Sequence, residues 1–134
     1  MTVFIAHAPA DRSHAEDLER TIERRGQFTE LDDGQTALRP VQQGDVLVLL
    51  VSQALLFATA RPRLEQRALD AWAEGRLIGV KRDHGIAPVG LRDLPAVDAS
   101  FEAQREFKWG EVADLIRDKL SARAPAPQAA EADR

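Results

Sequence analysis

Residues 44–52 read GDVLVLLVS, and this stretch decides the fold. Val46 to Val51 form an uninterrupted apolar run of Val and Leu, and Ser52 ends it. Such a run is typical of a strand that is buried on both faces, because a strand with one wet face alternates polar and apolar residues. Strands buried on both faces belong to parallel sheets, so the stretch predicts a central strand of a helix-covered parallel sheet.

Four shorter strands are expected around this one. The chain alternates these strands with helical patterns, which is typical of a three-layer α/β fold. The expected strands are Val3 to Ala6, Gln27 to Leu31, Leu77 to Val80 and Ala96 to Asp98. Apolar residues at helical spacing predict helices from about Ser13 to Gly26, from Pro62 to Gly75 and over Trp109 to Leu120, with Trp72 and Trp109 in the core.

The connection between the second and third strands is unusually short. It begins with the turn signature Asp32, Asp33 and Gly34, and it spans only a dozen residues, from Asp32 to Gln43. Pro40 lies inside this segment, so no long regular helix is expected there. The residues from Gln53 to Arg63 are expected to form a loop or irregular turn.

Length and composition limit the class of protein. With 134 residues and 44% hydrophobic content, the chain predicts one domain, residues 1–121, followed by an Ala/Pro-rich tail or linker over residues 122–134 that is expected to be disordered. No apolar run approaches the roughly 20 residues of a membrane-spanning helix. The first residues lack the basic start of a secretory signal, so a cytoplasmic location is expected.

Charge and residue types exclude several functions. The formal net charge is −4 and no Lys/Arg block is present, which argues against nucleic-acid binding. The chain has no Cys, and therefore no disulfide and no thiolate site. His7, His14 and His84 lie far apart without metal-ligand spacing, so no metal site and no cofactor are expected.

Candidate ligand residues follow the first strand, because ligands of such sheets bind at the carboxyl ends of central strands. Backbone N–H groups around Ala6, His7 and Ala8, together with Asp11 at the start of a helix, could hold a phosphate. The alternative is that Asp11 caps that helix, which typically contributes about 1 kcal/mol. The cap is the preferred role of Asp11, with ligand contact as a second role of the same loop.

A second set of signals concerns the helix start and the end of the central strand. Ser13 and Glu16 fit a capping box at the first helix. Ser52 could donate a hydrogen bond to a ligand. It has no His/Asp partner pattern and no G-x-S-x-G elbow, so it is not expected to be a nucleophile.

Four segments together resemble the Toll/interleukin-1 receptor (TIR) domain family over residues 1–121. They are VFIAHAPAD at 3–11, GDVLVLLVS at 44–52, RLEQRALDAW at 63–72 and, more weakly, FKW at 107–109. The resemblance implies a flavodoxin-like parallel sheet of five strands in the order 2-1-3-4-5. Response-regulator receivers share that order, but they need acidic residues where this chain has His7, Ala8 and Ser52, and that interpretation is set aside.

The TIR resemblance implies one of two functions in signalling. Some members are hydrolases that cleave the nicotinamide–ribose bond of NAD⁺ with a Glu on the helix after the central strand, which by motif position is Glu65. NAD⁺ would then be the substrate, with linear or cyclic ADP-ribose as product. The substrate-binding residues expected on this basis are Ala6, His7, Ala8, Asp11, Asp33, Gly34 and Ser52.

Other TIR domains are inert adaptors that act by homotypic assembly. The resemblance places such self-association in the loop after the second strand, Asp32 to Val41. Glu65 also has an ordinary interpretation, as a solvated helix residue paired with Arg61 for about 0.2 to 0.5 kcal/mol.

Overall fold

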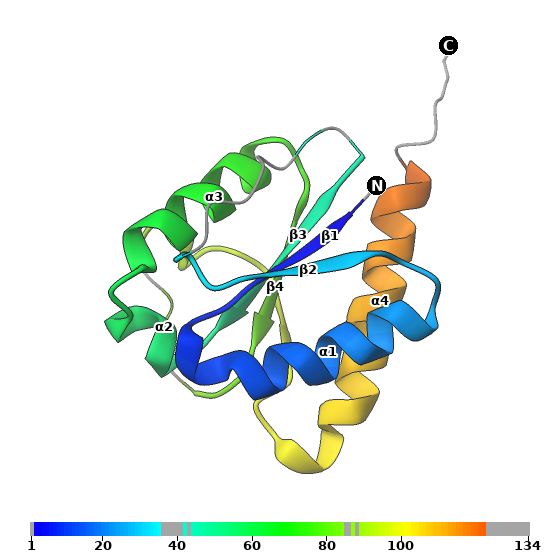
Figure 1. Cartoon of the computed structure of the whole chain (residues 1–134), viewed down its shortest axis with the longest axis horizontal. Helices are drawn as coiled ribbons and strands as arrows, with labels where there is room; N and C mark the ends of the chain where they lie inside the picture. Colours follow the sequence, from blue (N-terminus) through cyan, green and yellow to red (C-terminus); the bar gives the residue numbers. More distant parts are fainter. Residues whose placement is uncertain (1, 36–41, 43, 85–86, 88, 123–134) are drawn as a thin grey trace.

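The computed structural model describes residues 2–35, 42, 44–84, 87 and 89–122. Within them a five-stranded, fully parallel sheet has the strand order β2-β1-β3-β4-β5 (Figure 1). The strands are β1 (Val3–Ala6), β2 (Thr29–Asp32), β3 (Val46–Val51), β4 (Leu77–Lys81) and β5 (Ala96–Asp98). The predicted fold class and strand order are therefore confirmed.

Helices cover both faces of the sheet, and β3 lies at its centre. Helices α1 (Arg12–Arg24) and α4 (Arg105–Ala122) lie on one face, and α2 (Gln53–Phe57) and α3 (Arg61–Ala73) lie on the other (Figure 1). Short 3₁₀ turns are formed by η1 (Pro9–Asp11), η2 (Val89–Leu91) and η3 (Glu102–Gln104). Every residue of β3 is buried, as its unbroken apolar run predicted.

Alternating strand residues build a separate core on each face, because successive side chains of a strand point to opposite sides. Val46, Val48 and Leu50 pack in one core with residues of α1 and α4, including Trp109. Leu47 and Leu49 pack in the other core with residues of α3. The predicted burial of Trp109 is confirmed, whereas Trp72 is only partly buried against the second core.

The second strand differs from its prediction. β2 begins at Thr29 and ends at Asp32, and Phe28, which was expected inside it, precedes it and is 78% exposed. Among the described strands, β2 pairs with β1 alone. An edge strand has less packing to bury a side chain at its end, so the apolar character of Phe28 did not place it in the sheet.

The segment after Ser52 also differs, because Gln53 to Phe57 form the short helix α2 instead of an irregular turn. The Ser52 side chain accepts a hydrogen bond from the backbone N–H of Leu55, 3.1 Å away, and so caps this helix. Helix α3 begins one residue before Pro62 and ends before Gly75, whose φ of +72° stops it. The sequence had marked that helix correctly.

The short connection between β2 and β3 lies partly outside the described residues, which omit 36–41 and 43. Its described residues, 33–35 and 42, are not helical. Asp45 anchors the end of the connection, since its carboxylate accepts hydrogen bonds of 2.9 Å from the backbone N–H groups of Thr2 and Gln42. The described part agrees with the predicted absence of a long helix.

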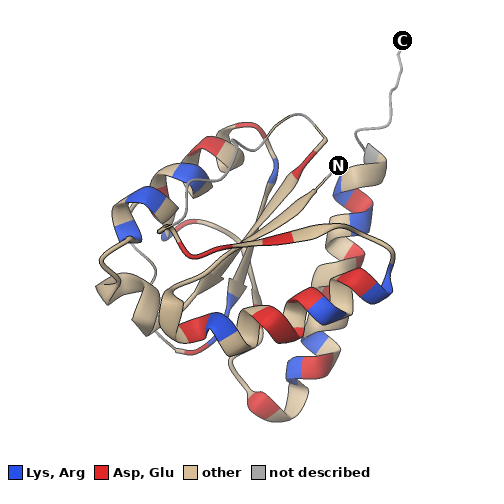
Figure 2. Cartoon of the chain, in the orientation of Figure 1, with Lys and Arg blue, Asp and Glu red and all other residues tan. Residues whose placement is uncertain are grey.

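Charged residues of both signs are interspersed along the helices, while the central strands carry few (Figure 2). In the described ranges, no helix combines the length and apolar character needed to cross a membrane. The described residues also contain no group of three or more His, Asp or Glu side chains that could hold a metal ion.

Candidate functional site at the carboxyl edge of the sheet

The carboxyl ends of β1 and β3 form the topological switch point of the sheet, where the connections that leave neighbouring strands run to opposite faces. The chain leaves β1 for α1 on one face and leaves β3 for α2 and α3 on the other. In open α/β sheets a crevice forms at such a point, and ligands bind there. The residues that follow these two strands are therefore the first to consider.

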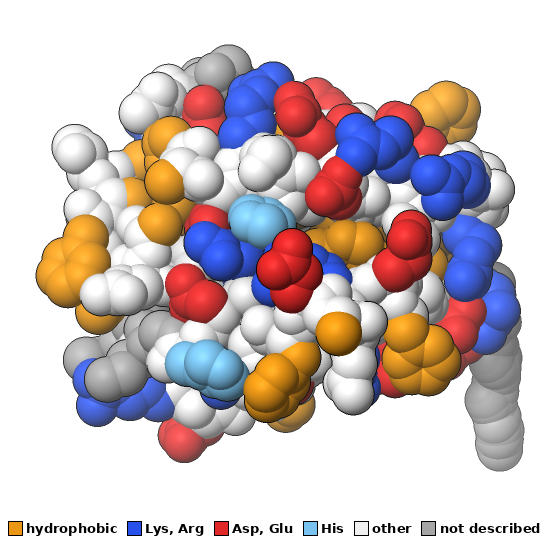
Figure 3. Space-filling model, turned by 90° about the horizontal axis from the view of Figure 1, so that it is seen from below, with side chains coloured by type: hydrophobic (Ala, Val, Ile, Leu, Met, Phe, Trp, Pro, Cys, Tyr) orange, Lys and Arg blue, Asp and Glu red, His pale blue; other side chains and the backbone are white. Residues whose placement is uncertain are grey.

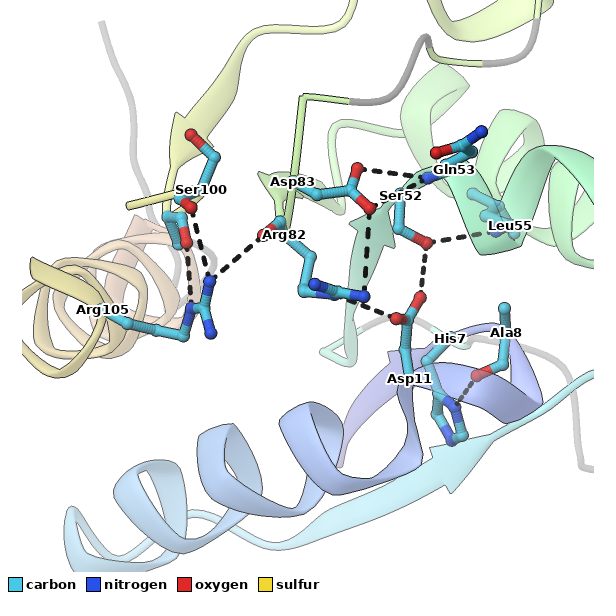
Figure 4. Close-up of polar contacts among 11 residues, drawn as sticks. His7, Ala8, Asp11, Ser52, Gln53, Leu55, Arg82, Asp83, Ser100 and Arg105 are labelled. Carbon is cyan, nitrogen blue, oxygen red and sulfur yellow. Dashed lines mark hydrogen bonds and ion pairs between the residues drawn. The ribbon is translucent and has the colours of Figure 1, made fainter. Parts of the chain in front are cut away.

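A buried polar cluster lies at this point of the sheet edge. The Ser52 hydroxyl donates a hydrogen bond to the Asp11 carboxylate, and the Arg82 Nε donates another to Asp11 Oδ1 over 3.0 Å (Figure 4). Asp11 and Ser52 are both 0% exposed, and the Arg82 side chain is 26% exposed. We call Asp11, Ser52 and Arg82 the switch-point cluster. Its members follow β1, β3 and β4, so the cluster ties three loops together.

Further contacts extend from the switch-point cluster (Figure 4). The Asp83 carboxylate accepts from the backbone N–H of Gln53, with N–O distances of 3.1 and 3.3 Å. Arg105 of α4 donates to three carbonyl oxygens, those of Ala99 at 3.0 Å and of Arg82 and Ser100 at 3.4 Å. The loops after β4 and β5 are therefore fixed by charged side chains.

The expected cap of the first helix is wrong. Asp11 occupies the N-cap position of α1, but its side chain makes no capping hydrogen bond. The carboxylate is instead bonded to Ser52 and Arg82, and the 3₁₀ turn η1 leads directly into α1 at Arg12. The capping box of Ser13 and Glu16 is also wrong, because helix α1 has already begun before Ser13.

The predicted ligand residues at the end of β1 are buried. Ala6 and His7 are 0% exposed and Ala8 is 1% exposed. The His7 Nδ1 donates to the carbonyl oxygen of Ala8 over 2.7 Å, and its Nε2 is buried without a hydrogen-bond partner among the described residues. These three residues therefore offer almost no exposed surface to a ligand, and ligand contact stays a prediction.

A cavity of about 420 Å³ lies beside His7, between α1 and β2. Its lining residues are His7, Arg12, Glu16, Glu19, Glu30, Leu31 and Asp33. Carboxylates dominate this lining, and Arg12 is already paired with Glu16 at 3.1 Å. Such a surface repels a diphosphate, so the cavity does not provide the phosphate site that was expected near Ala8.

Glu65 lies in the second turn of α3. Its carboxylate is paired with Arg61 at 3.1 Å, as the ordinary interpretation of this residue predicted, and its side chain is 24% exposed. The preceding residue, Leu64, packs against Gly34. A Cβ atom added to Gly34 would lie 3.0 Å from Leu64 and 2.7 Å from Ala60. The turn after β2 and the start of α3 are therefore in contact.

A second buried ion pair, which the sequence did not reveal, lies at the end of β2. Asp32 is 1% exposed and is paired with Arg67 of α3 over 2.5 Å. The Arg67 guanidinium lies 5.2 Å from the centre of the Phe4 ring, within range of a cation–π contact. This pair fixes α3 to β2 and so holds Glu65 beside the turn at Gly34.

The charges of the switch-point cluster affect the pKa of the nearby His14. Desolvation by burial, followed by the positive charges of Arg82 and Arg105, holds the pKa of His14 below its ordinary value of 6.5. Asp11 and Glu102 act in the opposite direction but do not outweigh them. The positive charges of Arg82 and Arg105 therefore outweigh Asp11 and Glu102 at this position.

The structure thus brings together only part of the predicted site. Asp11 and Ser52 meet directly, and Gly34 lies next to the turn of α3 that carries Glu65. No described contact joins Glu65 to the switch-point cluster. Arg82 and Arg67 were missed, since a single Arg in a loop or helix carries no pattern that reveals its partner. The available signal was the position of two acidic residues, Asp11 in the loop after β1 and Asp32 at the last residue of β2.

Comparison with known proteins supports the fold and nothing finer. The sequence matches no protein-family model and no curated protein. Among solved structures it is similar to the regulatory domain of the master biofilm regulator CsgD, with a TM-score of 0.51 and 12% sequence identity. The match covers 91% of this chain and 96% of that one. At this identity the likeness shows a shared α/β fold alone.

Proposed function

We propose that the chain is a TIR-like module that hydrolyses NAD⁺ slowly, with Glu65 as its catalytic carboxylate. The C–N bond between ribose and nicotinamide breaks, and the bond electrons leave with neutral nicotinamide. A water oxygen then bonds to the ribose carbon and loses a proton, which gives ADP-ribose. The resemblance of residues 3–11, 44–52 and 63–72 to TIR motifs motivates this choice.

One structural observation carries the proposal. Glu65 is a partly exposed carboxylate, and the preceding residue of its helix touches Gly34 at the carboxyl edge of the sheet. Gly34 belongs to the loop in which the resemblance places part of the nucleotide site. This position is available to a ligand, whereas Asp11 and Ser52 are fully buried.

The chemistry needs little more than such a carboxylate. Because the leaving nicotinamide starts as a cation and departs neutral, it needs little acid catalysis. The protein must orient the substrate and stabilise the positive charge that develops on the ribose. A fixed negative charge beside the ribose supplies that stabilisation.

The ion pair with Arg61 does not prevent this role. A surface pair at this spacing on a helix contributes only about 0.2 to 0.5 kcal/mol, so a cationic substrate can compete with Arg61 for the carboxylate. The Arg61 side chain is 41% exposed and can turn toward solvent. We expect the pair to open when NAD⁺ binds.

The test is nicotinamide release by purified protein, dilute and concentrated, in the presence of NAD⁺. Glu65→Ala should lower the rate by about 10² to 10³ and leave the unfolding curve nearly unchanged. Asp70→Ala is the matched control, because Asp70 is an exposed carboxylate on the same helix, hydrogen-bonded to Gln66 at 2.8 Å. Intact NAD⁺ at every concentration, or equal rates for wild type and Glu65→Ala, would refute the enzyme proposal.

The second candidate is a TIR-like adaptor that acts by self-association. Large apolar side chains are exposed at Phe57 (74%), Phe101 (56%) and Phe107 (70%), and surface phenylalanines are common anchors of protein interfaces. Figure 3 shows hydrophobic side chains as separate patches between charged ones on one face of the molecule. The exposed phenylalanines are the observation that favours this candidate.

The assembly segment predicted from the resemblance, Asp32 to Val41, lies mostly outside the described residues. Light scattering over a wide concentration range tests it. We expect the average mass to rise with concentration, and charge reversal at Asp33 or Arg39 to weaken that rise. A protein that stays monomeric throughout has no such function.

A further inference from the structure

We propose that Ser52 and Arg82 form a subsite for a phosphate group at the switch point, and that the Asp11 carboxylate fills this subsite as an internal anion. Ligand phosphate enters when that carboxylate leaves. This proposal does not depend on NAD⁺ cleavage or on Glu65. It concerns different side chains, which directly follow β3 and β4.

The donors at this position are those that bind phosphate. A guanidinium N–H and a hydroxyl converge on one carboxylate, the Arg82 bond measuring 3.0 Å (Figure 4). Arginine and hydroxyl groups recognise phosphate oxygens with the same geometry that they use for carboxylate oxygens. The crevice between β1 and β3 is also where this class of sheet binds its ligands. The two donors are thus placed where a ligand anion would lie.

The depth of Asp11 distinguishes this contact from a surface ion pair. Asp11 and Ser52 are 0% exposed, while Arg82 retains 26% exposure and so reaches solvent. A charge is buried only when other groups compensate the loss of its hydration. The cluster therefore already provides the compensation that a dehydrated anion needs, and Arg82 is its member in contact with solvent.

Neighbouring charges favour an anion at this position. Arg105 lies next to Arg82, since its Nη2 donates to the Arg82 carbonyl oxygen over 3.4 Å. Asp83 lies 3.9 Å from Arg82 Nη2 and also accepts from the backbone N–H of Gln53. Once the Asp11 carboxylate is removed, Arg82 keeps one carboxylate neighbour, Asp83, and Arg105 adds a second positive charge nearby.

The experiment titrates inorganic phosphate into wild-type protein, Asp11→Ala and Asp11→Asn at constant ionic strength, with chloride as the comparison anion. Calorimetry or thermal shift gives the affinity. Asp11→Ala should bind phosphate at least about tenfold more tightly than wild type, because the substitution removes the negative charge of the carboxylate and frees the space that it occupies. Asp11→Asn should gain less, because the amide still fills the space.

Three controls assign the effect to the subsite. Arg82→Gln in the Asp11→Ala background should abolish the gain. Asp17→Ala should produce no gain, because Asp17 is exposed and paired with Arg20 on the surface of α1. AMP compared with adenosine then separates the sources of phosphate. If AMP binds more strongly than inorganic phosphate and adenosine does not bind, the site recognises a nucleotide phosphate. If AMP and inorganic phosphate bind equally, the site recognises free phosphate.

Each outcome decides the question. Equal phosphate affinity for wild type and Asp11→Ala overturns the proposal, and so does a gain that survives Arg82→Gln. If Asp11→Ala is unfolded in plain buffer, phosphate must restore the fold, because a ligand that binds only the native state stabilises it. A variant that stays unfolded in phosphate, or that refolds equally in chloride, also overturns the proposal.

Discussion

Two carboxylates at the carboxyl edge of the same sheet have opposite surroundings. Asp11, after β1, is completely buried and is bonded to Ser52 and Arg82. Glu65, on α3, keeps 24% exposure and is paired with Arg61 at the surface of its own helix. Because Asp11 is buried, its charge depends on its protein partners, whereas water can solvate the Glu65 carboxylate when Arg61 turns away. The difference shows that two carboxylates near the same sheet edge depend on protein partners to different degrees, according to their burial.

The largest expected effect follows from removing the cation beside Asp11. Arg82→Met leaves a fully buried carboxylate without its counter-charge, which should lower the free energy of unfolding by about 3 to 5 kcal/mol. Urea denaturation measures the loss. Arg20→Met is the matched control, because it breaks an exposed pair with Asp17 and should cost less than about 1 kcal/mol. Similar losses in both variants would mean that the switch-point cluster behaves as a surface pair.

An intermediate effect on stability is expected in the turn after β2, where Gly34 has a φ of +78°. Gly34→Ala combines the strain of that backbone conformation, about 1 kcal/mol, with a clash against Ala60 and Leu64 that costs about 1 to 3 kcal/mol more. It should also lower nicotinamide release, since it pushes the turn away from α3.

Gly26→Ala is the matched control, and the difference between the two variants gives the cost of the clash at Gly34. Gly26 has a similar φ of +88°, but a Cβ atom there meets nothing within 4 Å. It should therefore show the backbone strain alone in thermal unfolding. Equal melting temperatures for the two variants would show that the turn and α3 are not tightly packed.

The smallest effect is a pH dependence at His14. Burial, then Arg82 and Arg105, lowers the pKa of His14 in the folded chain, against the smaller opposite effects of Asp11 and Glu102. The unfolded chain therefore binds the proton first as the pH falls through about 6.5, and stability that is fully present above that pH is lost below it. His14→Gln should reduce the acid-induced shift of the urea midpoint between pH 7.5 and 5.5. An unchanged shift would show that His14 does not feel the switch-point charges.

The fold was largely predictable from local patterns. The unbroken apolar run at Val46 to Val51 is buried on both faces, and the helical stripes that include Leu18 and Trp109 lie in the core. Hydrophobic burial depends on periodicity, which the sequence displays directly. Phe28 shows the limit of that reasoning, because whether an apolar residue at a strand end is buried depends on its neighbours across the sheet.

The positions of Asp11 and Ser52 in the candidate site were predicted from the sequence, but the side chains that they bond to were not. The sequence placed Asp11 and Ser52 at the ends of two strands, and the parallel sheet brings those ends together. It did not reveal that the two side chains bond to each other, or that Arg82, 71 residues away from Asp11 in the sequence, completes the cluster. A prediction from local helix signals assigned Asp11 to a cap, because such signals compare only residues a few positions apart.

The sequence by itself determined the sheet, its central strand and the three long helices that cover it, because each of these depends on the spacing of apolar residues along a short segment. The tertiary structure alone decided what the charged residues do. Asp11 became a buried internal anion and Glu65 stayed near solvent, although both are acidic residues close to the same edge. The physical reason is that the cost of a charge depends on its solvation and on the partners around it, which come from distant segments and exist only once the chain has folded.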